Sequence, residues 1–187
     1  FEDMVIGAHG HGAGGIDSGV TYVIRGRSTG WLNGVSFEHS DARFDGVSTQ
    51  WSGYSVAGLE DINGDSCDEL LIGAPLTYAD PGGHCGAVHV LLGGAGCWSG
   101  GTDLSLADAV FVGEQMNDHV GYATAGIGDI NGDGVSDFAV GAPLWPQVAA
   151  DGLTYVIFGT PAGWSGTNSL STADASFEGE RPGANAG

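Results

Sequence analysis

A repeat of about 67 residues constrains the fold of this chain more than any other feature. The run Asp61-Ile-Asn-Gly-Asp65 returns 68 residues later as Asp129-Ile-Asn-Gly-Asp133, and Leu-Ile-Gly-Ala-Pro ending at Pro75 returns as Ala-Val-Gly-Ala-Pro ending at Pro143. A third copy of the second element, Met4-Val-Ile-Gly-Ala8, stands near the start of the chain. Self-similarity at a fixed period is typical of repeat architectures, so the chain is interpreted as a series of similar units.

Each complete unit contains four short runs rich in β-branched and aromatic residues and bounded by Gly, Pro, Asp or Ser. In the first complete unit they are 54–59, 69–74, 87–92 and 109–113. Such runs predict strands, and no segment of ten residues keeps a helical period of apolar residues. Because four strands per repeat are typical of a propeller blade, the sequence predicts an all-β fold of β-propeller blades, each with four antiparallel strands.

The repeat also predicts where one unit ends and the next begins. Residues 1–52 contain strands two to four of a partial blade, 53–119 form a complete blade, and 120–187 form a second complete blade and the start of another repeat. This is a fragment of about three blades, whereas closed propellers have roughly 4 to 8. We therefore expect an incomplete ring, which other blades of a longer protein or further copies of the chain would close.

Two residue types recur at fixed places in the units. Glycines in the first strand suit a crowded position near the central axis, and they are Gly53, Gly58, Gly121 and Gly126. Tryptophans in glycine-rich turns predict a structural wedge between the third and fourth strands, and they are Trp31, Trp98 and Trp164.

Composition excludes several classes of partner. Against 23 acidic residues the chain has only four arginines and no lysine, which gives a formal net charge of −19. Phosphate backbones and anionic lipid surfaces are held largely by Lys and Arg, so nucleic-acid and membrane-surface roles are disfavoured. No apolar stretch approaches the roughly 18 residues of a membrane span. The acidity is explained if clusters of carboxylates hold divalent cations.

The clearest candidate ligands follow the first strand of the second complete blade. Oxygen-bearing side chains stand at positions 1, 3, 5 and 9 of a loop, and a main-chain carbonyl at position 7 adds a ligand: Asp129, Asn131, Asp133, Val135 and Asp137. Gly134 at position 6 allows the sharp turn. Oxygen ligands without sulfur or imidazole favour Ca²⁺. An EF-hand requires Glu at position 12, where this chain has Val140, so that interpretation fails.

The loop of the first complete blade departs from this pattern. Its candidate ligands are Asp61, Asn63, Asp65, the Cys67 carbonyl and Glu69. Ser66 replaces the turn glycine and Glu69 replaces the ninth-position Asp, so we expect weaker calcium binding here. Asp3 occupies the ninth position of a third loop whose other ligands precede Phe1, and it should be an orphan. The alternative is that all these loops are Asn-Gly and Asp-Gly hairpin turns with incidental carboxylates.

The Asp-x-Asn-Gly-Asp-(Gly)-x-x-Asp loop, followed by an apolar strand ending in Gly-Ala-Pro and then by a strand such as Gly-Ala-Val-His-Val, resembles the FG-GAP repeat of integrin α-subunit propellers. The resemblance covers nearly the whole chain. The glycine-rich composition and the Asp-Ile-Asn-Gly-Asp motif are similar to the bacterial branch of the family. The resemblance implies blades whose first-to-second-strand loop holds Ca²⁺, in adhesion receptors, in a phospholipase that cleaves lipid anchors and in bacterial surface proteins. It therefore implies an extracellular or cell-surface location.

The three cysteines leave one pairing open. Cys67 lies in a metal loop and Cys97 lies between the third and fourth strands, and the alternation of strand direction puts both on one face. A disulfide between them is one alternative and three thiols are the other. Cys85 falls on the opposite face and should stand outside any such bridge.

Aromatic residues that break the repeat are the candidates for partner binding. Tyr78 and Trp145 follow the Gly-Ala-Pro strand, in loops that share one propeller face, and an exposed aromatic there can stack on a sugar ring or anchor a protein. Packing of Trp145 under Pro146 is the alternative. No nucleophile motif or carboxylate pair outside the metal loops indicates catalysis.

These observations predict a non-enzymatic, calcium-stabilised scaffold that presents loops for protein or glycan binding and adhesion. Two rival hypotheses remain. The chain could be a non-catalytic propeller that accompanies a hydrolase domain, as in the phospholipase that the resemblance names, or it could be a lectin.

Overall fold

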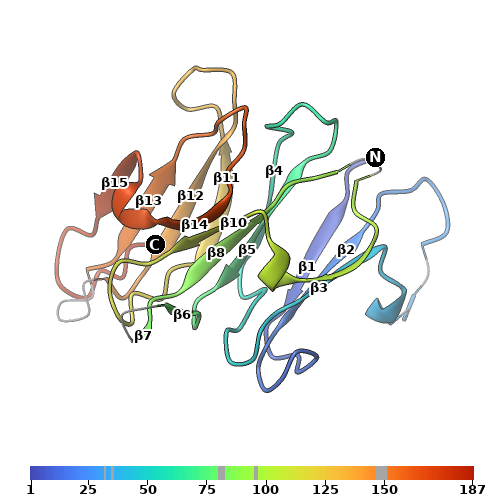
Figure 1. Ribbon diagram of the computed structural model, residues 1–187, viewed down its shortest axis with the longest axis horizontal. Helices are drawn as coiled ribbons and strands as arrows, with labels where there is room; N and C mark the ends of the chain where they lie inside the picture. Colours follow the sequence, from blue (N-terminus) through green and yellow to red (C-terminus); the bar gives the residue numbers. More distant parts are fainter. Residues whose placement is uncertain (32, 35, 80–82, 95–96, 146–150) are drawn as a thin grey trace.

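The computed structural model of the chain describes residues 1–31, 33–34, 36–79, 83–94, 97–145 and 151–187, and for residue 79 it describes the backbone only. Within these ranges the regular structure consists of β-strands and three short 3₁₀ turns, without any α-helix. Figure 1 shows three twisted sheets side by side in chain order, which do not close into a ring. The predicted all-β fold of propeller blades is therefore confirmed.

The first sheet has the order β1-β2-β3-β9. Its strands are β1 (Met4–Ala8), β2 (Val20–Ile24), β3 (Ala42–Asp45) and β9 (Gly100–Asp103). The first three are antiparallel, and β9 comes from the next repeat and pairs parallel with β3.

The second sheet has the order β14-β10-β8-β5-β4. Its strands are β4 (Val56–Leu59), β5 (Glu69–Ala74), β8 (Ala87–Leu91), β10 (Ala109–Val112) and, from the following repeat, β14 (Gly166–Ser169). Its four own strands are antiparallel, and β14 is parallel to β10. A small hairpin of β6 (Tyr78–Ala79) and β7 (Gly83–His84) projects from the connection between β5 and β8.

The third sheet has the order β11-β12-β13-β15, all antiparallel. These strands are β11 (Ala123–Gly128), β12 (Asp137–Ala142), β13 (Leu153–Ile157) and β15 (Ala175–Glu178). A 3₁₀ turn precedes the last strand of each unit, and the three turns are η1 (Phe37–His39), η2 (Leu104–Leu106) and η3 (Leu170–Thr172).

The parallel strands β9 and β14 were not predicted from the sequence. Each lies in the connection between the third and fourth strands of its own unit, yet it pairs with the last strand of the preceding sheet. The runs Gly100–Asp103 and Gly166–Ser169 are polar and rich in glycine, so they lack the β-branched and aromatic pattern that marks strands. Neighbouring units are thus joined by main-chain hydrogen bonds as well as by side-chain packing.

Among the residues that the structure describes, the hydrophobic core consists of two clusters, each between two neighbouring sheets. Buried Val23 and Phe44 of the first sheet pack with Ile72 and Leu104 of the second unit, whereas Leu71 and Phe111 of the second pack with Phe138 and Tyr155 of the third. Both faces of the central sheet are therefore covered, and its strand β5 is buried along its whole length.

Trp98 and Trp164 lie between sheets, so the expectation that they wedge between the third and fourth strands of one blade is wrong, whereas Trp31 is 56% exposed and donates to the carbonyl oxygen of Arg27. Trp98 meets Phe44 edge-on at a ring-centroid distance of 5.6 Å, and Trp164 meets Phe111 at 5.9 Å in the same way. In both cases the phenylalanine belongs to the last strand of the preceding sheet. Each tryptophan lies two residues before β9 or β14, the strands that pair with the preceding sheet. Its ring is therefore placed at the boundary between the two sheets.

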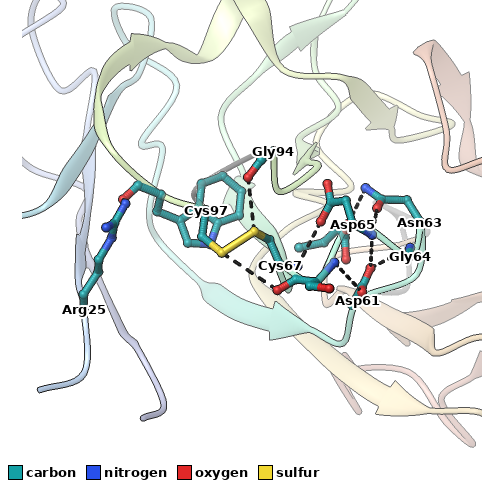
Figure 2. Close-up of a disulfide and its surroundings, with 11 residues drawn as sticks. Arg25, Asp61, Asn63, Gly64, Asp65, Cys67, Gly94 and Cys97 are labelled. Carbon is teal, nitrogen blue, oxygen red and sulfur yellow. Dashed lines mark hydrogen bonds between the residues drawn. A yellow bond between two sulfur atoms is a disulfide. The ribbon is translucent and has the colours of Figure 1, made fainter.

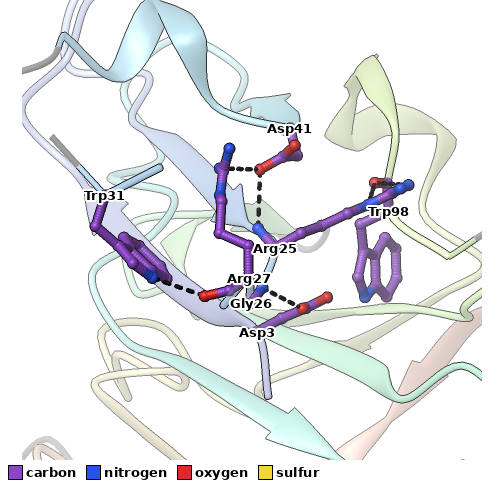
Figure 3. A network of polar contacts seen from close by, with 7 residues as sticks. All are labelled: Asp3, Arg25, Gly26, Arg27, Trp31, Asp41 and Trp98. Atoms are coloured by element: carbon purple, nitrogen blue, oxygen red, sulfur yellow. Dashed lines mark hydrogen bonds and ion pairs between the residues drawn. The ribbon is translucent and has the colours of Figure 1, made fainter. Parts of the chain in front are cut away.

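A charged contact adds to the junction of the first two sheets. The Nε of Arg25, just after β2, donates to the carbonyl oxygen of Trp98 at 2.8 Å (Figure 3). The main-chain N–H of Arg25 donates to the Oδ2 of Asp41, which also accepts from the Nη2 of Arg27 at 3.1 Å. Asp108 and Asp174 accept equivalent main-chain N–H groups in the next two units. In all three units, therefore, an aspartate at the same repeat position accepts a hydrogen bond from the residue that follows the third strand.

Close packing of the first strands explains two of the predicted glycines. A Cβ on Gly126 of β11 would lie 2.5 Å from the carbonyl oxygen of Gly58 in β4. At the entrance to the same strand Gly121 has a φ of +88° and its Cβ would meet the Ala87 oxygen at 2.4 Å. Both positions therefore exclude a side chain for steric reasons, as expected near the axis of a propeller.

His89 generates a prediction about acid stability. It lies in the middle of β8, opposite Ile72 and Val110, and its burial lowers its pKa to about 4. An unfolded histidine titrates at about 6.5, so acidification from pH 7 to 5 protonates the unfolded state first and lowers the free energy of unfolding by about 2 kcal/mol. Tyr22 and Tyr155 occupy the equivalent positions in the other sheets, which makes His89→Tyr a suitable variant.

Urea unfolding at pH 7 and pH 5 tests this prediction. Carboxylates that titrate in this range are common to both proteins, so their effect cancels in the comparison. The wild-type chain should therefore lose more stability between the two pH values than His89→Tyr, because only the wild type has the buried histidine. Equal losses would show that His89 does not govern the difference.

Candidate metal centre and binding face

The connection between β4 and β5 folds around the side chain of Asp61. Its Oδ1 accepts the main-chain N–H of Gly64 at 2.7 Å and its Oδ2 accepts that of Ser66 at 2.8 Å. The Oδ1 of Asp65 accepts the N–H of Cys67 at 2.9 Å in turn. These short aspartate side chains accept hydrogen bonds from main-chain N–H groups a few residues later in the sequence. The chain therefore turns back on itself, as Figure 2 shows. The alternate residues 61, 63 and 65 are thereby held on one loop.

Glu69, at the start of β5, is fully buried, and its carboxyl group contacts this loop. Its Oε2 accepts the N–H of Ile62 at 3.1 Å, and its Oε1 accepts the amide of Asn63 at 2.9 Å. Burial, with a smaller contribution from the charges of Asp61, Asp65 and Asp68, raises the pKa of Glu69 to about 7 against the opposing hydrogen bond from Ile62. The carboxyl group is thus held where its negative charge is poorly solvated.

Carboxylate oxygens of Asp61, Asp65 and Glu69 lie within 4.8 Å of one another. Three carboxylates at this distance repel one another, and a divalent cation with a preference for hard oxygen ligands relieves that repulsion. The donor set contains no sulfur or imidazole, which fits Ca²⁺ or Mg²⁺ better than a transition metal. The residues present therefore suit a divalent cation.

The connection between β11 and β12 repeats this hydrogen-bond pattern. Asp129 accepts from Gly132 at 2.7 Å and from Gly134 at 2.8 Å, and Asp133 accepts from Val135. The buried Asp137 uses one oxygen for Ile130 and the other for Gly159, each within 2.9 Å. In the described part of the chain only the first loop has three carboxylates as close as 4.8 Å.

The two sequence departures of the first loop have different consequences. Ser66 has a φ of +72° where Gly134 has +90°, so the serine does occupy a left-handed position that disfavours a side chain. Glu69, by contrast, extends far enough to join the carboxylate cluster. The order of affinities expected from the sequence therefore rests on the strain at Ser66.

Asp3 stands at the position of Glu69 and Asp137 in the first unit. Its Oδ1 accepts the N–H of Gly26 at 2.9 Å, as Asp137 accepts that of Gly159. In these two units the ninth-position aspartate thus accepts an N–H group just beyond the end of the third strand, whether or not it faces a complete loop.

The structure contains the disulfide between Cys67 and Cys97, which the sequence left open, with the two Cα atoms 5.3 Å apart (Figure 2). It ties the first metal loop to the turn that precedes Trp98. Cys85 is buried and stands outside the bridge. The seventh-position residue, whose carbonyl is a candidate ligand, is therefore covalently anchored to the junction between two sheets.

A row of aromatic rings occupies the face opposite the metal loops. His9 lies 5.0 Å from Tyr54, Tyr54 lies 4.4 Å from Tyr122, and the rings of Tyr122 and His119 stack at 6.1 Å. Trp51 stacks on Tyr54 at 6.2 Å. These side chains come from the entrances of β4 and β11 and from the end of β1. Sequence reasoning missed them, although Trp51 and Tyr54 are spaced from His119 and Tyr122 by one repeat.

The two predicted partner residues have different surroundings. Tyr78 is 66% exposed in β6, on the face that carries the aromatic row, and lies edge-on to His84. Trp145 is half-buried and packs against the core cluster between the second and third sheets, so most of its ring is not available to a ligand. The proposed contact of Trp145 with Pro146 lies outside the described residues.

Comparison with known proteins places these loops in a family. The FG-GAP repeat family matches residues 52–91 and 120–157, which run from the entrance of the first strand through the metal loop to the third strand of both complete units.

The chain is similar to α-subunits of integrins. It is 37% identical to integrin alpha-PS2 of Drosophila melanogaster over 61% of the chain, 33% identical to integrin alpha-6 of Gallus gallus over 81%, and 31% identical to integrin alpha-5 of Xenopus laevis over 87%. It spans only 8%, 12% and 14% of those proteins, respectively. No helix in the described ranges has the length and apolar character that crossing a bilayer requires.

The disulfide yields a prediction about stability. It closes a sequence separation of 30 residues, so its reduction should lower the free energy of unfolding by about 3 to 4 kcal/mol through the entropy of the unfolded chain. Chemical denaturation with and without reductant measures the difference, with Cys85→Ala as the control in which it should persist. A thiol assay in denaturant should detect one thiol before reduction and three afterwards; three before reduction would contradict the bridge.

Proposed function

Because the chain carries FG-GAP repeats, we propose that it is a calcium-stabilised part of the propeller of an extracellular or cell-surface protein, and that it binds a protein ligand in adhesion. The similarity to integrin α-subunits supports the adhesion class. The single observation that carries ligand binding is the aromatic row on the face opposite the metal loops.

Calcium would be held in each complete unit by the residues at positions 1, 3, 5, 7 and 9 of its loop. In the first loop these are Asp61, Asn63, Asp65, the Cys67 carbonyl and Glu69, and in the second they are Asp129, Asn131, Asp133, the Val135 carbonyl and Asp137. The bound cation supplies positive charge that offsets the repulsion among carboxylates. Its effect is structural, since binding to the folded loop alone stabilises the fold.

The opposite face suits recognition for geometric reasons. Strand direction alternates within each sheet, so the connections from second to third strands and from fourth to first strands meet at one edge, the lower one in Figure 1. Tyr78 and the aromatic row share this edge. Aromatic side chains are enriched among the residues that dominate protein interfaces, because they bury a large area at a small cost in side-chain entropy.

Calcium titration tests the metal loops one at a time. Asp133→Ala leaves the first loop intact and Asp65→Ala leaves the second, and calorimetry should give the weaker affinity for the first loop because of the left-handed Ser66. Adding Ser66→Gly to Asp133→Ala should strengthen binding about fivefold, since the strain is on the order of 1 kcal/mol.

The calorimetric results separate two claims. No heat of binding in any single-loop variant would refute calcium stabilisation. Equal or reversed affinities of the two loops, with no effect of Ser66→Gly, would refute only the role of the strain at that residue.

Binding to immobilised extracellular-matrix proteins and to a glycan array tests the recognition face. We expect the wild-type chain to bind a matrix protein and Tyr78→Ala to bind at least about tenfold more weakly, the effect of losing roughly 1.4 kcal/mol at an anchor residue. Ile130→Ala is the matched control, because Ile130 is 57% exposed on the opposite, metal-loop face. Binding to glycans alone would favour a lectin, and unchanged binding by both Tyr78→Ala and Tyr122→Ala, the latter in the aromatic row, would refute this face as the site.

A further inference from the structure

The disulfide of this chain begins inside a metal loop. Cys67 is the seventh residue of the first loop, the one whose carbonyl oxygen is a candidate ligand, and its sulfur is bonded to that of Cys97 (Figure 2). The second loop has Val135 at the same position, so it contains no bridge. Asp61 and Asp129 accept equivalent main-chain N–H groups in the two loops. The second loop is therefore a control for the effect of the covalent link on the first.

The main chain of Cys67 also contacts a candidate ligand. Its N–H donates to the Oδ1 of Asp65 at 2.9 Å, as the N–H of Val135 donates to Asp133. The position of residue 67 therefore determines the positions of two candidate ligands, its own carbonyl oxygen and the carboxylate of Asp65. A displacement of this residue would disturb both.

The residue before Cys67 gives the loop a reason to move. Ser66 has a φ of +72°, whereas the second loop has a glycine, Gly134, at this position. A side chain in the left-handed region costs on the order of 1 kcal/mol, and rotation of Ser66 to a negative φ would relieve this strain. The same rotation would displace residue 67 and its carbonyl oxygen. The strained turn and the covalent bridge thus occur in the same loop, where the bridge opposes the relaxation.

The other end of the bridge lies at a packed boundary between sheets. Trp98, the residue after Cys97, is 8% exposed and meets Phe44 of the first sheet edge-on. Its carbonyl oxygen accepts a hydrogen bond from the Nε of Arg25 at 2.8 Å (Figure 3). The bridge therefore connects a strained loop to a part of the chain that side-chain packing and a charged hydrogen bond hold in place.

Reduction removes this connection. A dithiol transfers two electrons and two protons to the bond between Cys67 and Cys97, which becomes two thiols, while the dithiol itself is oxidised to a disulfide. Cys97 is only half-buried, so a thiolate can approach the bridge from its side. In the reduced chain, Ser66 can relax without displacing Cys97.

We propose that the Cys67–Cys97 disulfide sets the calcium affinity of the first loop by opposing relaxation at Ser66, so that reduction weakens this site and leaves the second loop unchanged. The inference rests on the proposed calcium function. Coupling between two sites is reciprocal, so calcium in the first loop makes the disulfide harder to reduce by the same factor. The chain thus responds to redox conditions at one metal loop and not at the other.

Single-loop variants measure the coupling. All carry Cys85→Ala, so that the two bridged cysteines are the only ones in the chain. Asp133→Ala leaves the first loop intact, and Asp65→Ala leaves the second. Calorimetry before and after reduction should show at least about fivefold weaker calcium binding by the first loop and an unchanged affinity of the second. Circular dichroism of each reduced sample checks that it is folded.

Redox titration measures the reciprocal effect. Each variant is equilibrated with mixtures of dithiothreitol and its disulfide, in millimolar Ca²⁺ or in chelator, and the bridged fraction is measured after thiol trapping. Ca²⁺ should raise the ratio of dithiol to disulfide that half-reduces Asp133→Ala by at least about fivefold. It should leave the ratio for Asp65→Ala unchanged.

The variant Ser66→Gly, added to Asp133→Ala, tests the cause of the coupling. Glycine adopts the left-handed conformation without strain, so reduction should weaken calcium binding by less than about twofold in this variant. A loss as large as that of Asp133→Ala alone would overturn the role of Ser66.

The outcomes separate the coupling from the calcium function on which it rests. Calcium binding by both loops, with no change on reduction, would overturn the coupling and leave calcium stabilisation in place. An equal shift of the redox titration in both single-loop variants would show that calcium protects the bridge through the stability of the whole chain, and it would also overturn the proposal. No calcium binding by either oxidised variant would refute calcium stabilisation itself, and the coupling with it.

Discussion

The close face-to-face packing of twisted sheets is the constraint on which the rest of the structure depends. Every sheet of four strands has two apolar faces to cover, and in this chain the central sheet covers one with each neighbour. Near the first strands the separation is so small that a Cβ on Gly126 would contact the backbone of β4. Farther out the space widens, and tryptophans such as Trp98 and Trp164 fill it. Glycine on one side and tryptophan on the other thus give each junction the wedge shape that a propeller requires. The parallel strands β9 and β14 add main-chain hydrogen bonds at the outer edge of each junction.

This packing separates two kinds of chemistry. Because consecutive strands alternate in direction, the loops rich in carboxylates gather at one edge of the sheets and the aromatic row gathers at the other. The charge at the metal edge is costly, as the raised pKa of buried Glu69 shows. The fold offsets part of this cost with main-chain N–H groups, which converge on Asp61 and on Glu69. The disulfide from Cys67 fixes the same loop to the turn before Trp98. The metal edge is therefore coupled to the packing between sheets.

Because the units repeat, residues at the same position of different units can be compared directly. Tyr22, His89 and Tyr155 occupy one position in three sheets, and only the histidine brings a titratable base into the core. Asp3, Glu69 and Asp137 likewise hold one position, and each accepts a main-chain N–H, yet only Glu69 joins a close triad of carboxylates. Differences of this kind show which properties belong to the unit and which belong to one copy.

The sequence by itself determined the period, the all-β fold, the strands that follow a β-branched pattern and the loops with alternate oxygen ligands. These features are local, since turn chemistry and side-chain alternation act within a few residues. Only the tertiary structure decided the pairing of β9 with β3, the placement of the tryptophans between sheets, the choice of the disulfide and the aromatic row. Tyr54 and Tyr122 are 68 residues apart, and no local rule brings their rings to 4.4 Å. That contact depends on how far one sheet rotates against the next, and the rotation is set by the packing of both sheets together.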